Sequence, residues 1–241
     1  MYQEIKPSER LNAIIDSFWI FSQNKASENF KVLPDTCADL IFDLNQNKAF
    51  LSGIMTNYQL RELTIESDLI GVRFKTEKFG SLFEIPLYET KNLRTELSQI
   101  FPFYEENLLT ELNNIKQTLH KVDFLENFVI TLFQKNYNRQ DNLVLSVVQK
   151  IRSLKGNIKI SDIAKSNNIS LRQLERRFKS YIGLTIKEFS NVVRFRNTKE
   201  LINSFTETSL LEIAFDSGFF DHSHMNYEFN RISGENPSYF R

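Results

Sequence analysis

The sequence has a single cysteine, Cys37, which excludes an internal disulfide framework. It has three histidines and no cysteine cluster, so no spacing indicates a metal site. No apolar run approaches the roughly 18 residues of a membrane span, and the charged start of the chain, with Glu4, Lys6 and Glu9, lacks the apolar core of a signal peptide. We therefore expect a cytoplasmic protein without cofactor, metal or membrane partner.

Sequence signatures of catalysis are also missing. The chain has no paired carboxylates at a useful spacing, no nucleophile elbow and no phosphate-binding loop. The sequence therefore predicts that the protein is not an enzyme.

The net charge is zero, but the charges are unevenly divided. Residues 141–241 contain 15 Lys or Arg against 11 Asp or Glu, a net charge of +4, which leaves −4 for residues 1–140. This asymmetry fits a basic nucleic-acid-binding half and an acidic regulatory half.

The last third of the chain, residues 157–241, contains two copies of one pattern. The offset is 50 residues from Ala164 to Ala214 and 51 from Phe178 to Phe229, so one residue is added in the second turn. The first copy comprises Ile163, Ala164, Asn168, Ile169, Leu174, Phe178, Gly183, Ile186 and Phe189, and the second comprises Ile213, Ala214, Gly218, Phe219, Met225, Phe229, Gly234, Pro237 and Phe240.

Each copy has the pattern of a helix-turn-helix unit, predicted at 157–183 and 207–234. A small alanine allows two helices to cross closely, and Asn168 or Gly218 tolerates the positive φ that the turn requires. The second helix of each unit, at about 170–181 or 221–232, begins at a capping residue, Ser170 or Asp221.

The outward side chains of these second helices are the candidate DNA-binding residues. They are Arg172, Gln173, Glu175, Arg176 and Lys179 in the first unit, and His222, Ser223, Asn226 and Tyr227 in the second. Arginine matches guanine edges and phosphates, glutamine and asparagine match adenine, and tyrosine can contact phosphate or a thymine methyl. A solvated amphipathic helix is the alternative for one basic helix, but two complete units favour DNA binding.

A helix of about 20 residues, 185–204, is predicted between the two units. At 1.5 Å per residue it spans roughly 30 Å, close to the roughly 34 Å of one turn of B-DNA. It would hold both recognition helices against successive major grooves. Its cations are Arg194, Arg196 and Lys199, and we expect at least one of them in an internal salt bridge.

Residues 159–241 resemble the DNA-binding domain of the AraC/XylS family of bacterial transcription regulators. The matching residues are Ile163, Ala164, Ser170, Leu174, Arg176, Phe178, Lys179, Gly183, Phe189, Arg194, Glu200, Leu201, Ile202, Ile213, Ala214, Gly218, Phe219, Asp221, Ser223, His224, Phe229, Gly234, Pro237, Tyr239 and Arg241. The chain departs from the family at Tyr227 and Asn230, where an Arg and a Lys are usual, and at Met225, where Phe is common. The second reading helix is therefore expected to be electrostatically weaker than the first.

The N-terminal part reads as a run of short strands at 17–22, 30–33, 39–44, 48–51, 55–60, 61–65 and 70–74. Short strands at this spacing indicate a small barrel or sandwich, and we favour a cupin-like half-barrel. Residues 33–37, Gly53 and 71–74 resemble the β-rich sensor of an AraC-like subgroup, from which residues 75–78 depart. The resemblance identifies no ligand.

The periodicity becomes helical from residue 91 to residue 138, with apolar stripes that include Leu93, Leu97 and Leu119. These helices either pack only on the strands or also form the seam of a homodimer. Residues 136–142 are polar and aperiodic, and are the predicted linker. The expected α+β architecture is thus a β-rich sensor at 1–90, a helical region at 91–138 and an all-α DNA-binding domain at 139–241.

The leading hypothesis is a sequence-specific transcription regulator that binds double-stranded DNA and, as the resemblance implies, RNA polymerase, with an N-terminal part that senses a small molecule or pairs two chains. One alternative is an anti-regulator whose basic helices bind a protein. Another is a DNA-linked enzyme that uses Cys37 to accept alkyl groups, but the related regulators activate that thiol with a four-cysteine zinc cluster, so a buried, inert Cys37 is favoured.

Overall fold

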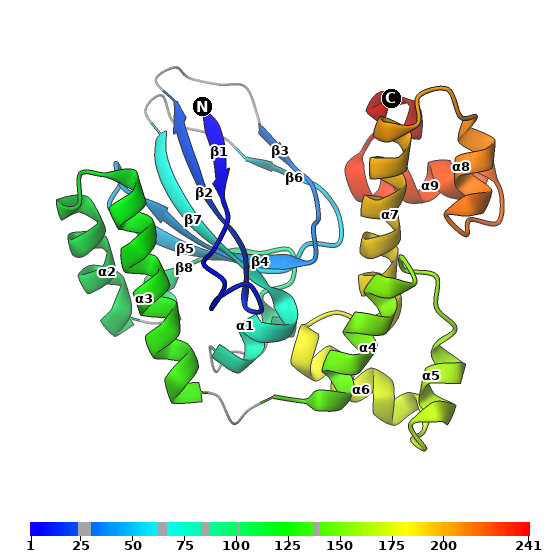
Figure 1. Ribbon diagram of the computed structural model, residues 1–241, viewed down its shortest axis with the longest axis horizontal. Coiled ribbons are helices and arrows are strands. Elements are labelled where there is room, and N and C mark those ends of the chain that lie inside the picture. Colours follow the sequence, from blue (N-terminus) through cyan, green and yellow to red (C-terminus); the bar gives the residue numbers. More distant parts are fainter. Residues whose placement is uncertain (24–29, 62–66, 83–86, 101, 137–139) are drawn as a thin grey trace.

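The computed structural model describes residues 1–23, 30–61, 67–82, 87–100, 102–136 and 140–241. The N-terminal strands form a layer with two helices on one side and the C-terminal helices beyond its opposite end (Figure 1). The α+β architecture that we expected is therefore confirmed.

The larger sheet has six antiparallel strands in the order β1-β2-β7-β4-β5-β8. Their bounds are β1 Tyr2–Ile5, β2 Ile15–Gln23, β4 Cys37–Asp43, β5 Lys48–Ser52, β7 Ser67–Lys75 and β8 Arg94–Glu96. A separate ladder pairs β3 Phe30–Val32 with β6 Gln59–Arg61. The large sheet has β1 at one edge and β8 at the other, so it is open, as in the half-barrel that we favoured, and not a closed barrel.

Five of the seven predicted strands are found close to their expected positions, as β2, β3, β4, β5 and β7. The strand predicted at 55–60 begins only at Gln59, and most of the strand predicted at 61–65 lies outside the described residues. The short edge strands β1 and β8 were not predicted. They have little apolar alternation, and each is defined by pairing with one long neighbour.

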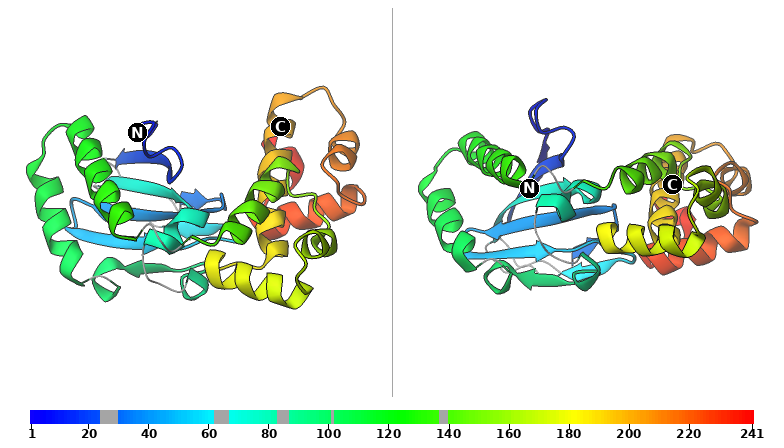
Figure 2. Two further views of the ribbon diagram at one scale, coloured as in Figure 1. Left: turned by 60° about the horizontal axis from the view of Figure 1, so that its bottom comes forward. Right: turned by 90° about the horizontal axis from the view of Figure 1, so that it is seen from below.

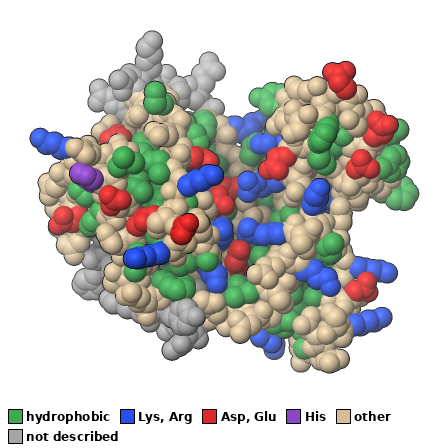
Figure 3. Space-filling view, viewed as in Figure 1, with side chains coloured by type: hydrophobic (Ala, Val, Ile, Leu, Met, Phe, Trp, Pro, Cys, Tyr) green, Lys and Arg blue, Asp and Glu red, His purple; other side chains and the backbone are tan. Residues whose placement is uncertain are grey.

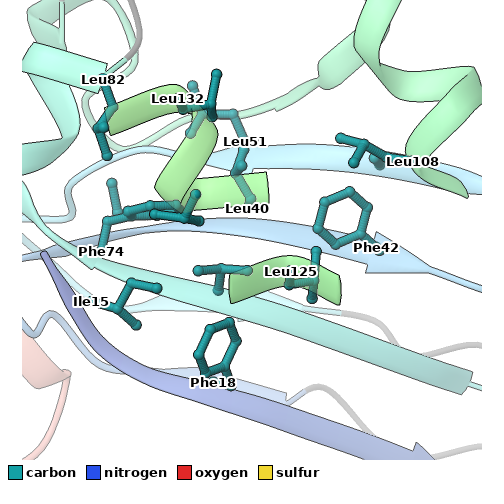
Figure 4. Packing of buried hydrophobic residues seen from close by; sticks show 14 of the residues in the cluster. Ile15, Phe18, Leu40, Phe42, Leu51, Phe74, Leu82, Leu108, Leu125 and Leu132 are labelled. Carbon is teal, nitrogen blue, oxygen red and sulfur yellow. The ribbon is translucent and has the colours of Figure 1, made fainter. Parts of the chain in front are cut away.

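One face of the large sheet packs against the helices α2 (Pro102–Asn114) and α3 (Thr118–Asn136). Leu112 and Leu125 are fully buried with Phe18 and Phe42, and Figure 4 shows the Leu125 side chain near the Phe42 ring. Burial of each such side chain stabilises the fold by about 1.5–3 kcal/mol. The expected packing of these helical stripes on the strands is therefore confirmed.

The start of the predicted helical region was wrong. Residues around Leu93 and Leu97 form β8 and a short 3₁₀ helix, η2 (Leu97–Gln99), because the backbone here pairs with β5. Two further short helices precede it, α1 (Thr76–Leu82) and η1 (Leu87–Glu89). Leu119 was placed in an apolar stripe, but it follows the break between α2 and α3 and is exposed.

The C-terminal part is helical throughout. Its elements are α4 Asn142–Ser153, α5 Ile160–Ser166, α6 Leu171–Ile182, α7 Ile186–Ser204, α8 Leu210–Asp216, α9 His222–Ser233 and the 3₁₀ helix η4 Pro237–Phe240. One apolar cluster joins α4, α5, α6 and the start of α7, and another joins the end of α7 with α8 and α9. The predicted helices are confirmed, while residues 137–139 of the predicted linker lie outside the described residues.

Both clusters receive a residue from the N-terminal part. Ile54 is fully buried in the first cluster, and Leu33 packs against the second. Polar contacts also cross between the two parts: Arg152 pairs with Glu77 at 2.9 Å, Lys91 with Glu188, and Lys31 with Glu235. The C-terminal part is thus fixed to the N-terminal part at both ends of α7.

Candidate nucleic-acid interface

The first helix-turn-helix unit consists of α5 and α6, and its turn has the geometry that the sequence predicts. Ala164 is buried at the helix crossing, and Asn168 has a φ of 52°. Ser170 caps α6 by accepting a hydrogen bond from the Gln173 backbone N–H at 3.2 Å. The Gln173 side-chain oxygen in turn accepts from the Ser170 backbone N–H at 3.0 Å, so this oxygen is part of the cap and only the amide group of Gln173 remains available as a donor.

The inner face of α6 is fully buried, which turns its other face outward. Leu174, Phe178 and Ile182 contact the core, while Arg172, Arg176 and Lys179 are exposed. Arg172 and Arg176, together with Ser170 and Gln173, surround a shallow hollow at the N-terminal end of the helix. This exposed basic strip is the strongest feature of the interface.

Two further charged residues of α6 contact other elements. Glu175, which we predicted to bind DNA, is half-buried and accepts a hydrogen bond from the backbone N–H of Ile186 at 3.4 Å, so it faces the start of α7. Arg177 makes two hydrogen bonds to Asp141, at 2.8 and 3.0 Å. Asp141 is itself the cap of α4, so this pair connects the two helices.

The second unit consists of α8 and α9. Gly218 has a φ of 73°, and Asp221 caps α9 by accepting from the His224 backbone N–H at 2.7 Å. His224 also accepts a hydrogen bond at Nδ1 from the Phe220 backbone N–H, and its ring packs edge-on against Phe219. Its role is therefore to close the turn.

The outer face of α9 differs in chemistry from that of α6. Ser223, Tyr227 and Asn230 are exposed along one side of the helix. His222 and Asn226 are half-buried, and their side chains approach each other at 3.5 Å. Of the four predicted residues of this unit, Ser223 and Tyr227 are thus exposed and His222 and Asn226 are half-buried, and none of them is a Lys or Arg.

The two reading helices are oriented alike relative to the N-terminal part. The C-terminal end of α6 packs on α1 and η1, and that of α9 meets Tyr58, whose backbone N–H donates to the Ile232 carbonyl at 2.7 Å. Figures 1 and 2 show both helices running away from the sheet toward their N-terminal ends. The N-terminal ends of both helices, where base-reading side chains are expected, are therefore exposed on the side away from the sheet.

The cations of α7 contact the protein itself, but not as we predicted. Arg194 stacks on Phe219 with 4.7 Å between its guanidinium carbon and the ring centre, Arg196 donates to the Asp35 carbonyl at 2.7 Å, and Lys199 lies over Phe240. Toward described residues none of the three forms a salt bridge. The partners of these three cations are two aromatic rings and a backbone carbonyl, whereas we predicted a carboxylate for at least one of them.

A cavity of about 300 Å³ lies between the large sheet and the β3–β6 ladder. Its walls are mostly apolar, with polar groups from both sheets; the lining residues include Trp19, Phe21, Phe30, Leu33, Asp35, Asp39, Met55, Arg61, Leu69, Arg73 and Arg94. Sequence reasoning did not find this cavity, because its lining comes from eight strands and the loops between them.

Two kinds of cation line the cavity. Arg73 pairs with Asp35 and Asp39 at 3.1 and 3.2 Å, and burial raises the pKa of Asp39 to about 6 despite this pairing and a hydrogen bond from Trp19 Nε1. Arg94 stacks on Phe50, and its buried Nε has no hydrogen-bond partner among the described residues. The cavity therefore contains both an arginine paired with carboxylates and, among the described residues, a guanidinium that forms no salt bridge.

Cys37 is buried, as expected. Burial raises the pKa of its thiol well above the ordinary value, and the nearby carboxylates of Asp35, Asp16 and Asp39 raise it further. The thiol is therefore protonated at neutral pH, the opposite of what a nucleophilic cysteine requires.

Comparison with protein families gives two matches. Residues 163–241 match a family described as a helix-turn-helix domain. They form an AraC-type domain. Residues 3–96 match a family described as a domain of unknown function, DUF6597. The resemblance of the C-terminal part to AraC-type regulators is thus confirmed.

Curated relatives match part of this chain. The Msm operon regulatory protein of Streptococcus mutans is 29% identical over 118 residues, which cover 48% of this chain and 42% of the relative. The HTH-type transcriptional regulator MtrA of Neisseria gonorrhoeae is 34% identical over 82 residues, which cover 34% of this chain and 27% of the relative. The chain therefore matches less than half the length of either protein.

Solved structures are also similar to the chain. ToxT of Vibrio cholerae has a TM-score of 0.45 and 16% identity, over 100% of this chain and 97% of that one. The C-terminal domain of AraT, a response regulator of Geobacillus stearothermophilus, has a TM-score of 0.40 and 24% identity, over 43% of this chain and 86% of that one.

Within the described residues, no helix is both long and apolar enough to cross a membrane.

Proposed function

We propose that the protein is a sequence-specific, DNA-binding transcription regulator of the bacterial cytoplasm that recruits or excludes RNA polymerase. The observation that carries the proposal is the exposed strip of Arg172, Arg176 and Lys179 on the second helix of an AraC-type unit. Such a helix, with its N-terminal residues toward base edges, is the element that enters the major groove.

The two units are proposed to occupy successive major grooves on one face of the duplex. The 19 residues of α7 between them span about 28 Å, near the roughly 34 Å of one helical turn. The common orientation of α6 and α9 supports simultaneous binding. Arg172 and Arg176 would contact base edges, and Lys179 a phosphate.

The test is a binding titration of the full chain against a duplex selected from a random library. Arg172→Ala and Arg176→Ala should each weaken binding by about 1–3 kcal/mol at particular bases. Arg10→Ala is the matched control, because it removes the same charge from an exposed position in the N-terminal part. Unchanged affinity in both α6 variants would show that this strip is not the DNA-binding surface.

A salt titration separates this function from that of an anti-regulator that binds only protein. Affinity for DNA should fall steeply as salt rises, because phosphate contacts release counterions. An enzyme that uses Cys37 is disfavoured by the burial and high pKa of the thiol.

For the N-terminal part we propose a sensor role, with the homodimer seam as the second candidate. The cavity supports sensing because Leu33 and Asp35, in its wall, also contact the second helix-turn-helix unit and Arg196. Its apolar walls and the Arg94 guanidinium favour an organic anion with an apolar body. The division into 1–90, 91–138 and 139–241 remains our proposal for the domain limits.

The sensor role is tested by thermal denaturation with a panel of aromatic and aliphatic carboxylates. A binding acid should raise the melting temperature of the wild type, and Arg94→Met should abolish that increase. If no acid in the panel raises it, while chemical crosslinking detects a dimer, the homodimer seam is favoured.

A further inference from the structure

The two helix-turn-helix units of this chain have opposite net charge. The α5–α6 segment, residues 160–182, has five Lys or Arg against two Asp or Glu, and the α8–α9 segment, residues 210–233, has one against four. With the offset of 51 residues, Arg172, Arg176 and Lys179 correspond to Ser223, Tyr227 and Asn230. These three exposed cations of the first reading helix are thus replaced by neutral side chains in the second.

The cations in and beside the second unit are held within the protein. Arg231 pairs with Glu228 at 2.6 Å on the same helix, and Arg194 is stacked on Phe219. Figure 3 shows the contrast: Lys and Arg side chains gather over the lower right, around α5, whereas acidic and apolar side chains occupy the upper right, around α8. The second unit therefore has little attraction for phosphate.

The same surface exposes large apolar groups. The residue added to the second turn is Phe220, because Ile169 corresponds to Phe219 at an offset of 50 and Ser170 to Asp221 at an offset of 51. Phe220 is 83% exposed just before the cap of α9, and Tyr227 is 65% exposed on the outer face of the helix. These two exposed aromatic side chains, one just before α9 and one on it, offer apolar surface for recognition of an apolar group.

We propose that α9 reads a thymine-rich half-site through apolar contacts, in which Tyr227 and Phe220 pack against thymine methyl groups. The proposal rests on the DNA-binding function proposed above and names what its second unit recognises. The C5-methyl of thymine is the apolar group that the major groove displays, and Ser223 and Asn226 add neutral hydrogen bonds beside it.

The different side chains of α6 and α9 predict different responses of DNA binding to salt. Affinity that comes from the α6 strip should fall as the salt concentration rises, because its phosphate contacts displace counterions. The specificity that α9 adds should not change with salt, because its apolar contacts displace none. The docking of both C-terminal helix ends on the N-terminal part supports DNA as the occupant, since it leaves the surface of α9 exposed on the same side as the basic strip of α6.

The experiment begins with in vitro selection of random duplexes by the full chain. We expect two sequence blocks about one helical turn apart, one of them thymine-rich. Replacing the thymines of that block with deoxyuridine, which lacks only the 5-methyl, should weaken binding about fourfold per contacted methyl, as expected for one buried methyl-sized group. The same replacement between the blocks is the DNA control and should have no effect.

Variants assign the methyl contact to its residue. In Tyr227→Ala and in Phe220→Ala, replacing thymine with deoxyuridine should weaken binding less than twofold. The dependence of affinity on salt concentration should stay as in the wild type. Tyr239→Ala, which removes another exposed tyrosine that lies in η4 and outside the second unit, is the matched control and should retain the full effect. Because all three side chains are exposed, unchanged melting temperatures should verify folding.

The outcomes separate the two proposals. If Arg172→Ala weakens binding and lowers the salt slope but deoxyuridine acts equally on the wild type and on Tyr227→Ala, the thymine reading is wrong and DNA binding stands. A single selected block, or a second block without thymines, also overturns it. If no duplex is bound in a salt-dependent manner, the proposed function itself fails.

Discussion

Single residues decide the shape of the cavity. Gly71 lies beside Trp19 in the β2–β7 ladder, and a Cβ at this position would come within 2.0 Å of the indole ring. Trp19 in turn donates to Asp39, which pairs with Arg73. A glycine in the middle of a strand therefore allows an aromatic ring to lie flat on the backbone and to hold a buried carboxylate.

Gly71→Ala should displace Trp19. The added methyl group overlaps the ring, so the indole must leave its place and the hydrogen bond to Asp39 must break. Because Trp19 is the only tryptophan, its emission maximum reports this change directly. We expect a red shift and a loss of about 1–3 kcal/mol in the free energy of unfolding. Gly80→Ala, where the nearest atom is 2.9 Å away, should leave the emission maximum unchanged.

Asp39 should make stability depend on pH. Its folded pKa of about 6 lies above the roughly 3.9 of an unfolded chain, so the folded state binds more protons between these values. Stability should therefore be greatest below about pH 4 for this group and should decrease as the pH rises to about 6. Asp39→Asn, which still accepts from Trp19, should remove a decrease of about 1–3 kcal/mol in urea unfolding between pH 4 and 7. A variant with the slope of the wild type would contradict the assignment.

At the scale of elements, the helix caps determine where the reading helices begin. Ser170 and Gln173 form a reciprocal cap on α6, whereas Asp221 caps α9 alone. Both capping residues have extended backbone conformations immediately before the first helical residue. The position of each cap therefore fixes which residues occupy the exposed N-terminal turn.

Ser170→Ala should destabilise the first unit by about 0.5–2 kcal/mol, because the Gln173 backbone N–H loses its acceptor. Ser180→Ala, an exposed change later in the same helix, should cost almost nothing. Thermal denaturation of both variants measures the difference. Equal melting temperatures in the two would show that the cap does not limit the stability of α6.

The elements that could be predicted from sequence are those with a complete local pattern. The capping residues, the positive-φ residues Asn168 and Gly218 and the apolar spacing specified α6 and α9 almost to the residue. By contrast, β8 was taken for a helix because the spacing of Leu93 and Leu97 is also helical, and only the neighbouring strand β5 decides between the two. The contact of Glu175 with Ile186 could not be predicted either, because its partner in α7 is 11 residues away.

At the scale of the whole molecule, the N-terminal part contacts both reading units separately. The cavity wall extends through Lys31, Leu33 and Asp35 to the second unit, while α1 and η1 contact the end of α6. The relative orientation of α6 and α9 therefore depends on these contacts as well as on α7. Periodicity in the sequence gives no information on such contacts, because their residues are more than 90 positions apart.

Loosening these contacts should be detectable at one backbone amide. The Tyr58 N–H donates to the Ile232 carbonyl across the two parts, so its hydrogen exchange reports whether the second unit is docked. Arg196→Ala removes the bond to the Asp35 carbonyl, and Glu235→Gln removes the charge that pairs with Lys31. Since each contact contributes about 0.5–1.5 kcal/mol, the double variant should exchange this amide roughly tenfold faster.

Glu96→Gln, which breaks the Lys48 pair within the N-terminal part, should not change the exchange rate of this amide. If protection of Tyr58 persists in the double variant, the apolar contacts of Leu33 and Ile54 are sufficient for docking, and the polar contacts do not control the orientation of α9.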